Sequence, residues 1–183
     1  MNRTNWKIAE QSKQRMVQAL LTVMKQYDYK EITVTQITQE AQLSRKAFYR
    51  LFSDKDDILS LFFDGLFQEF FEQIRTREVH RYWDAVQVFF DFWEERRELL
   101  LLLRKNRLLP RVFERSYQCS MEVFEFVRSQ ETAAAFALPL PYMLAYSVGG
   151  MHTMLLKWVE KGMDIPSSEL IAMLKSGFRS DNI

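Results

Sequence analysis

The segment from Ile32 to Ile58, ITVTQITQEAQLSRKAFYRLFSDKDDI, limits the fold of this chain more than any other stretch. Thr33 is suited to cap a helix, and Gln36 stands three residues later, as in a capping box. Ile32 and Ile37 occupy the two positions of a hydrophobic staple. This pattern predicts that a short helix begins at Thr33 and ends near residue 41.

A second helix start follows almost at once. Gln42 and Leu43 leave room only for a tight turn, and Ser44 is a second N-cap candidate. Leu43 and Phe48 again stand at the two staple positions. The segment therefore predicts a helix, a turn and a second helix.

The second predicted helix has two chemically different sides. At about 100° per residue, the apolar side carries Ala47, Phe48, Leu51 and Phe52, and the opposite side carries Arg45, Lys46, Tyr49 and Arg50. The apolar side must be buried. The other side presents three cations and a phenol, which is the chemistry needed to contact phosphates and guanine edges in a DNA major groove.

The charge distribution favours the same interpretation. A net charge of +1 over 183 residues would by itself argue against a nucleic-acid partner. However, residues 1–50 hold nine Lys or Arg against four Asp or Glu, whereas the remainder holds sixteen against twenty. A basic head on an acidic body is typical of a DNA-binding module joined to a domain that does not bind DNA.

Residues 33–59 resemble the DNA-binding motif of TetR-family transcriptional regulators. The family pattern runs Thr, Ile-Ala, an Ala-Gly turn, Ser, a Tyr with Phe three residues on, Lys and a closing Leu. Its places are held here by Thr33, Ile37-Thr38, Ala41-Gln42, Ser44, Tyr49, Phe52, Lys55 and Ile58-Leu59. Two residues depart from the pattern. Gln42 replaces the usual turn glycine, which strains the turn if that position needs a positive φ, and Leu51 replaces a frequently polar residue.

The resemblance implies an N-terminal helix-turn-helix DNA-binding domain over residues 1–54 and a helical effector-binding and dimerisation domain over residues 55–183. It implies a homodimeric regulator, a repressor that a small-molecule effector releases from a near-palindromic double-stranded operator. The two recognition helices of a C2 dimer would lie about 34 Å apart. We expect Arg45 and Lys46 to contact base edges and Tyr49 to contact a phosphate or a thymine methyl. Backbone phosphates would be held by Thr33, Thr35, Ser44, Arg50 and Lys55.

The rest of the chain predicts an all-α fold, because its apolar residues recur at helical spacing and no strand-like alternation is sustained. About nine helices are expected, near residues 6–26, 33–41, 44–51, 54–74, 83–96, 99–109, 110–127, 141–161 and 167–179. Lys7, Lys13 and Arg15 lie on the polar side of the first helix, where they form either a solvated face or a contact with the DNA backbone.

The helix near residues 141–161 carries a seam of apolar residues and the pair Gly149-Gly150. Glycines inside a helix each cost about 1 kcal/mol relative to alanine, which is tolerable if another backbone approaches closely. This region is similar to the C-terminal domain of short TetR-like regulators, and the resemblance implies a four-helix dimer interface. The expected interface residues are Leu144, Val148, Met151, Leu155, Trp158, Leu170 and Leu174. An ordinary intramolecular packing helix is the alternative.

Large aromatic side chains are abundant after residue 80. By analogy with the family, some of them would line an effector pocket between helices. The candidates are Trp93, Phe113, Tyr117, Tyr142, Tyr146 and His152. The tyrosine and histidine tips need polar partners that a ligand could supply, but the sequence alone does not separate pocket residues from core residues.

No constellation of catalytic residues is evident, so we expect no enzyme activity, no metal and no cofactor. The two histidines, His80 and His152, have no partner at metal-ligand spacing. The single Cys119 suits a reducing cytoplasm, and the apolar run from Leu99 to Leu103 is far too short to span a membrane. We therefore expect a soluble cytoplasmic protein.

Two other functions are compatible with the sequence. The first is a TetR-like coactivator or scaffold that acts through protein contacts without binding DNA, which the near-neutral charge, Gln42 and Leu51 leave open. The second is a helical small-molecule-binding protein or enzyme in which the motif is incidental. Retention of the set Arg45, Lys46, Tyr49 and Lys55 argues against the first.

Overall fold

The computed structural model describes residues 3–77, 79–130 and 140–177. Within these ranges the chain forms nine α-helices, one 3-10 turn and no strand, which confirms the predicted all-α class and helix number. The elements are α1 (Arg3–Gln26), η1 (Tyr29–Glu31), α2 (Val34–Glu40), α3 (Arg45–Leu51), α4 (Lys55–Thr76), α5 (Tyr82–Glu95), α6 (Arg97–Lys105), α7 (Leu109–Gln130), α8 (Leu140–Glu160) and α9 (Ser167–Gly177). The last two residues of the final predicted helix lie outside the described residues.

The chain divides into two compact units. The first contains Met1–Leu66 together with Arg104–Arg107, and the second contains Phe67–Leu103 together with Leu108–Ile183. This division differs from the boundary at residues 54 and 55 expected from the sequence. The difference arises because α4 contributes residues to both units, and because four residues from the α6–α7 connection belong to the first.

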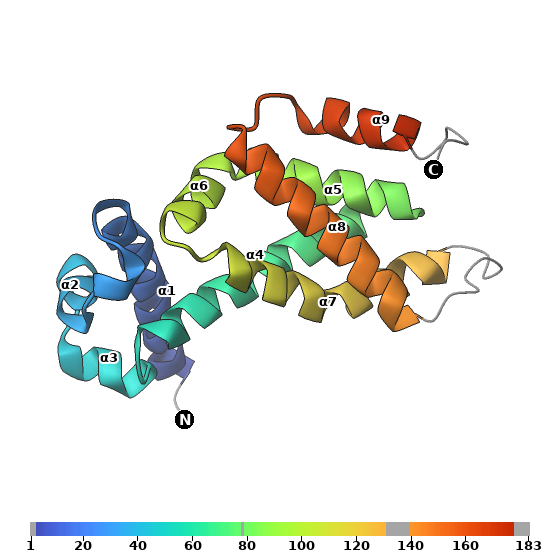
Figure 1. The fold of residues 1–183 in the computed structure, drawn as a ribbon. Helices are drawn as coiled ribbons and strands as arrows, with labels where there is room; N and C mark the ends of the chain where they lie inside the picture. Colours follow the sequence, from blue (N-terminus) through green and yellow to red (C-terminus); the bar gives the residue numbers. More distant parts are fainter. Residues whose placement is uncertain (1–2, 78, 131–139, 178–183) are drawn as a thin grey trace. The chain divides into compact units, whose positions relative to one another are not determined.

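The first unit is built on the apolar side of α1, which packs against α2 and α3 (Figure 1). Met16, Leu20 and Met24 follow one another at four-residue intervals along α1 and are fully buried. Ile37 of α2 and Phe48 of α3 are also fully buried. Burying a side chain of this size contributes about 1.5–3 kcal/mol, so these contacts hold the two short helices on α1.

Asn106 is a buried polar residue in the core of the first unit, with only 2% of its surface exposed. Its Oδ1 accepts a hydrogen bond of 2.7 Å from the Tyr29 backbone N–H, and its Nδ2 donates one of 3.3 Å to the Met24 carbonyl. The neighbouring Lys105 Nζ donates to the Lys25 carbonyl at 2.7 Å. The amide thus satisfies backbone groups where the chain leaves α1 and enters η1.

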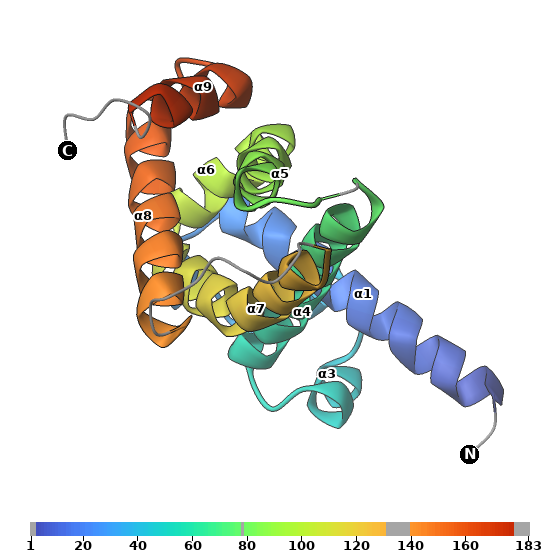
Figure 2. The same cartoon turned by 90° about the vertical axis from the view of Figure 1, so that its right-hand side faces the viewer.

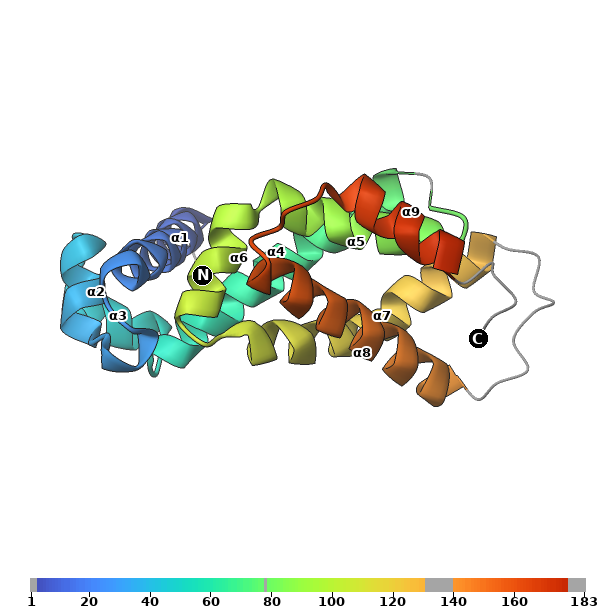
Figure 3. The same cartoon turned by 45° about the horizontal axis from the view of Figure 1, so that its top comes forward.

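The second unit is a layered helical bundle. Helices α7 and α8 pack against each other (Figure 2), and α9 lies beside α5 (Figure 3). Its core is rich in aromatic residues, with Phe90 and Trp158 in edge contact at 5.9 Å between ring centroids. None of the helices in the described ranges is long and apolar enough to cross a membrane.

We expect Asn106→Ala to lower the free energy of unfolding of the first unit by about 1–3 kcal/mol, because it leaves a buried N–H and a buried carbonyl without their partner. Hydrogen exchange of the Tyr29 amide should become faster. Lys105→Ala is the control, since it removes only an exposed side chain and should change the stability by less than about 1 kcal/mol. Equal effects of the two variants would contradict a special role for the buried amide.

Candidate nucleic-acid interface

Helix α2 begins with the predicted capping box. Thr33 Oγ1 accepts a 3.3 Å hydrogen bond from the Gln36 N–H, and the Gln36 side chain accepts one of 2.8 Å from the Thr33 N–H. At the other end, the Leu43 N–H donates to the Thr38 carbonyl at 2.9 Å, a bond typical of a helix C-terminus. These local bonds fix both the start of α2 and the direction in which the chain leaves it.

The turn after α2 depends on Gln42, whose φ is +52°. This left-handed conformation costs an L-residue roughly 1–2 kcal/mol, so the replacement of the usual glycine does strain the turn. Arg15 of α1 offsets part of that strain, because its guanidinium donates to the carbonyls of Ala41 and Gln42. Arg15 therefore caps the negative end of α2.

Helix α3 is positioned by one cap and one buried ring. Ser44 Oγ accepts a 3.0 Å hydrogen bond from the Ala47 N–H, as predicted for an N-cap. Phe48 is 0% exposed, which fixes the rotation of the helix about its axis. The opposite side, formed by Arg45, Lys46, Tyr49 and Arg50, is exposed to solvent.

The exposed side of α3 is strongly positive. Among the described residues, no acidic side chain forms an ion pair with Arg45, Lys46 or Arg50. The Arg45 guanidinium lies 6.0 Å from the centroid of the Tyr49 ring, at the outer range of a cation–π contact. Tyr49 is 55% exposed, so its ring and hydroxyl are accessible. The exposed side of α3 thus combines cations that have no counterion among the described residues with an accessible phenol.

Lys55, in the first turn of α4, makes contacts other than the phosphate contact predicted from the sequence. Its Nζ donates to the carbonyls of Tyr29, Lys30 and Ile32 at 2.7, 2.9 and 2.8 Å. It also lies 4.9 Å from the centroid of the Tyr29 ring. A lysine ammonium has three N–H donors, and all three are used within the protein. Lys55 therefore ties α4 to η1.

The other residues proposed for DNA contact are on the surface. Thr33, Thr35 and Ser44 are exposed at the start of α2 and the start of α3. The hydroxyls of Thr33 and Ser44 also accept their capping hydrogen bonds. Seven of the eight predicted residues are thus exposed, and the half-buried Lys55 is the exception.

Residues 16–61 match the family model described as bacterial regulatory proteins, tetR family. The match covers 46 of the 183 residues, so it is this segment of the chain that is similar to the TetR family. Comparisons with curated proteins and with solved structures gave no match. The matched segment runs from α1 into α4 and contains the whole candidate interface. The match supports a DNA-binding transcription regulator of the TetR type.

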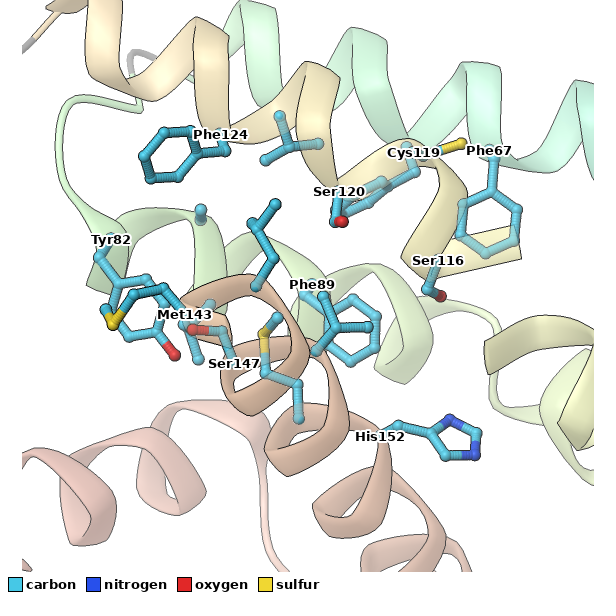
Figure 4. A pocket seen from close by; sticks show the side chains of 17 residues that line it. Phe67, Tyr82, Phe89, Ser116, Cys119, Ser120, Phe124, Met143, Ser147 and His152 are labelled. Atoms are coloured by element: carbon cyan, nitrogen blue, oxygen red, sulfur yellow. The ribbon is translucent and has the colours of Figure 1, made fainter. Parts of the chain in front are cut away.

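The second unit encloses a cavity of about 120 Å³ between α4, α5, α7 and α8 (Figure 4). It is lined by Phe67, Phe70, Tyr82, Ala85, Val86, Phe89, Ser116, Cys119, Ser120, Val123, Phe124, Met143, Leu144, Ser147, Val148, Met151 and His152. The small side chains of Ser116, Cys119 and Ser120 recur on one side of α7, where they leave space that larger residues would fill. That spacing is the sequence signal by which the cavity could have been recognised.

Of the six residues predicted from the sequence to form an effector pocket, His152 alone lines this cavity. Trp93 is fully buried in the core, and Phe113 contacts the His152 ring from outside the lining at 4.6 Å between centroids. Tyr117, Tyr142 and Tyr146 are 42%, 76% and 68% exposed. The aromatic content of the sequence did not distinguish these three environments, because each depends on which side of a helix the neighbouring helices cover.

The seam predicted as a dimer interface is also placed differently. Leu144, Val148, Leu155 and Trp158 are all at most 9% exposed within the single chain. The Trp158 indole N–H donates to the Ile165 carbonyl at 2.9 Å. These four residues pack inside the chain, in agreement with the intramolecular alternative. Met151, Leu170 and Leu174 are half-buried.

We expect Lys55→Ala to destabilise the first unit by about 2 kcal/mol, because three carbonyls lose a charged donor. Urea denaturation of the variant would measure this loss. Lys30→Ala is the matched control, since the Lys30 side chain is exposed and only its backbone carbonyl contacts Lys55. Unchanged stability together with a weaker salt dependence of DNA binding would instead favour a phosphate contact for Lys55.

Proposed function

We propose that this protein is a homodimeric repressor of the TetR type that reads a near-palindromic operator and is released by a small-molecule effector. The proposed DNA binding is supported by the exposed, positively charged side of α3. The cations on this side have no acidic partners among the described residues. Neighbouring cations without acidic partners repel one another in the free protein. The same arrangement suits a surface that binds phosphates.

Within this interface, Arg45 and Lys46 at the start of α3 contact base edges. The N-terminal residues of a recognition helix are those that usually reach into the major groove. Tyr49 contacts a phosphate or a thymine methyl, and Arg50 and the exposed hydroxyl residues Thr33, Thr35 and Ser44 bind the backbone. Arg45 then determines sequence preference, and Arg50 contributes affinity.

The exposed side of α8 is the surface through which two copies associate. This α8 outer face consists of the exposed residues Tyr142, Tyr146, Gly150 and Thr153 together with the half-buried Gly149. The first charged residue of α8 is Lys157, so the face has no formal charge. The Thr153 hydroxyl donates to the Gly149 carbonyl at 2.9 Å, so its donor hydrogen is used within the helix.

The two glycines support this assignment. A Cβ atom added at Gly149 or Gly150 would meet nothing within 4 Å, so packing inside the chain does not require glycine there. A glycine inside a helix is nevertheless destabilising by about 1 kcal/mol relative to alanine. Close approach of a second α8 backbone would account for both residues, and the exposed tyrosines would then be covered by the partner.

Effector release requires a ligand site connected to the DNA-reading unit. Phe67 and Phe70 of α4 line the cavity, and the same helix begins at Lys55, which is bonded to η1. A ligand that alters the packing around Phe67 therefore acts on an element shared by both units.

The sequence-reading role of Arg45 is tested by electrophoretic mobility shift with DNA from upstream of the protein's own gene. We expect Arg45→Ala to lose about 1–3 kcal/mol on the cognate site and little on random DNA, because a bidentate base contact carries discrimination. Arg50→Ala is the matched comparison from the same helix and should weaken both DNAs similarly. An equal loss on both DNAs for Arg45→Ala would make it a phosphate contact.

No sequence-dependent shift of any upstream fragment, with or without candidate ligands, would remove the repressor proposal. It would favour the alternative of a TetR-like scaffold that acts through protein contacts.

The dimer is tested with Gly150→Leu. The chain has open space at this position, so the monomer should not lose stability, and leucine is a better helix former by about 1 kcal/mol. A closely approaching partner helix would be pushed away, so we expect the dimer dissociation constant to rise on the order of tenfold or more. Analytical ultracentrifugation would measure it.

Gly65→Leu is the control for this experiment. Gly65 is also an exposed glycine inside a helix, and a Cβ atom added there would meet nothing within 4 Å, but it belongs to α4. The same substitution there should leave the association constant unchanged. If both variants, or neither, changed dimerisation, the α8 outer face would not be the interface.

A further inference from the structure

The cavity of the second unit has an uncharged wall. None of its seventeen lining residues is Asp, Glu, Lys or Arg. Most are aromatic or aliphatic, and the polar members are small hydroxyl side chains, one thiol, one phenol and one imidazole. A charged molecule placed there would lose its hydration without gaining a counterion, which is strongly unfavourable.

The serine hydroxyls of α7 are already bonded to their own helix. Ser116 Oγ donates to the Val112 carbonyl at 2.8 Å, and Ser120 Oγ donates to the Tyr117 carbonyl at 2.6 Å. Their donor hydrogens thus point at the backbone, and the side of the cavity formed by α7 offers a ligand no strong hydrogen-bond donor. This side of the wall is chemically closer to an aliphatic surface than its composition suggests.

A polar group is present at one end of the cavity, where Tyr82, Met143 and Ser147 lie together (Figure 4). The Ser147 hydroxyl is near enough to the Tyr82 phenol to act on its pKa as a hydrogen-bond partner. Each hydroxyl has one O–H donor, so when one O–H serves this interaction the other is left for a ligand. Tyr82 is 40% exposed, which places this end at the opening of the cavity.

Two titratable lining residues, Tyr82 and His152, have pKa values shifted toward their neutral forms. Burial raises the pKa of Tyr82, partly offset by its hydrogen bond to Ser147, so the phenol stays protonated. Burial lowers the pKa of His152 below its ordinary value, so the imidazole stays unprotonated above that value. His152 lies at the end of the lining opposite Tyr82 (Figure 4).

We infer that the cavity binds a small uncharged molecule, mostly apolar, with a single hydrogen-bond acceptor that meets the Tyr82–Ser147 hydroxyl pair. This inference rests on the proposed function, in which the cavity holds the effector. The volume of about 120 Å³ limits the ligand to about one ring or a short chain. For comparison, an apolar cavity of about 150 Å³ in another protein binds benzene.

Four probes built on the same benzene ring test the inference. Benzyl alcohol has a neutral polar group, toluene has none, benzoate is an anion and benzylammonium is a cation. Cys119 lines the cavity and is the single cysteine of the chain, so its modification by methyl methanethiosulfonate, counted by mass spectrometry, reports occupancy directly. The midpoint of thermal unfolding is the second readout, because a ligand that binds the folded state raises it.

We expect benzyl alcohol to bind most tightly, to slow the modification of Cys119 and to raise the unfolding midpoint. Toluene should do so more weakly. Benzoate and benzylammonium should bind at least about tenfold more weakly than benzyl alcohol, since the cavity offers no counterion. Equal or better protection by either ion would overturn the inference, as would failure of both neutral probes in both readouts.

Two variants localise the effect. Tyr82→Phe removes one hydroxyl of the pair and should weaken benzyl alcohol but not toluene. Ala85→Leu fills part of the cavity and should abolish protection by both neutral probes, whereas Ala172→Leu, on the exposed side of α9, should not. If Ala85→Leu failed to fold, the Tyr82→Phe comparison would still decide, because equal weakening of both probes contradicts the assigned hydroxyl.

The operator mobility shift separates this inference from the proposed function. If benzyl alcohol protects Cys119 but leaves the operator complex intact, the ligand class stands and release by an effector fails. If a charged compound both protects Cys119 and releases the operator, effector release stands and the ligand class fails.

Discussion

The ammonium of Lys55 joins two parts of the first unit that are far apart in the sequence. Its three donors bind carbonyls of Tyr29, Lys30 and Ile32, the short segment between α1 and α2. The Tyr29 hydroxyl donates a hydrogen bond to Asp56 Oδ1 at 2.9 Å. The start of α4 is therefore joined to η1 by two successive residues, Lys55 and Asp56. This connection fixes the segment that enters α2, and apolar packing on α1 holds α2 and α3 themselves.

Asn106 adds a second constraint at the same place. Its side-chain oxygen accepts from the Tyr29 N–H, and residues 104–107 belong to the first unit. Two segments that are distant in sequence, the start of α4 and residues 104–107, therefore converge on a 3-10 turn of three residues. This is why a domain boundary drawn where the helix-turn-helix pattern ends does not coincide with the boundary between the compact units.

The local features of the interface were predictable because they depend on residues within four positions of each other. Thr33 with Gln36, and Ser44 with Ala47, form the expected caps, and Phe48 faces inward as the helical period requires. The role of Lys55, the burial of the α8 seam and the lining of the cavity depend on contacts between distant segments. Periodicity indicates that one side of α8 is apolar, but not whether its own chain or a second chain covers it.

Helix α8 contributes residues both to the proposed dimer surface and to the cavity of the second unit. Tyr142 and Tyr146 belong to its outer face, whereas the next residues, Met143 and Ser147, line the cavity. Because a helix moves as a rigid rod, a ligand that displaces Met143 or Ser147 also displaces the tyrosines beside them. Ligand binding and dimer geometry would then be linked through α8, and by thermodynamic reciprocity the association of two copies would change the affinity of the cavity for its ligand.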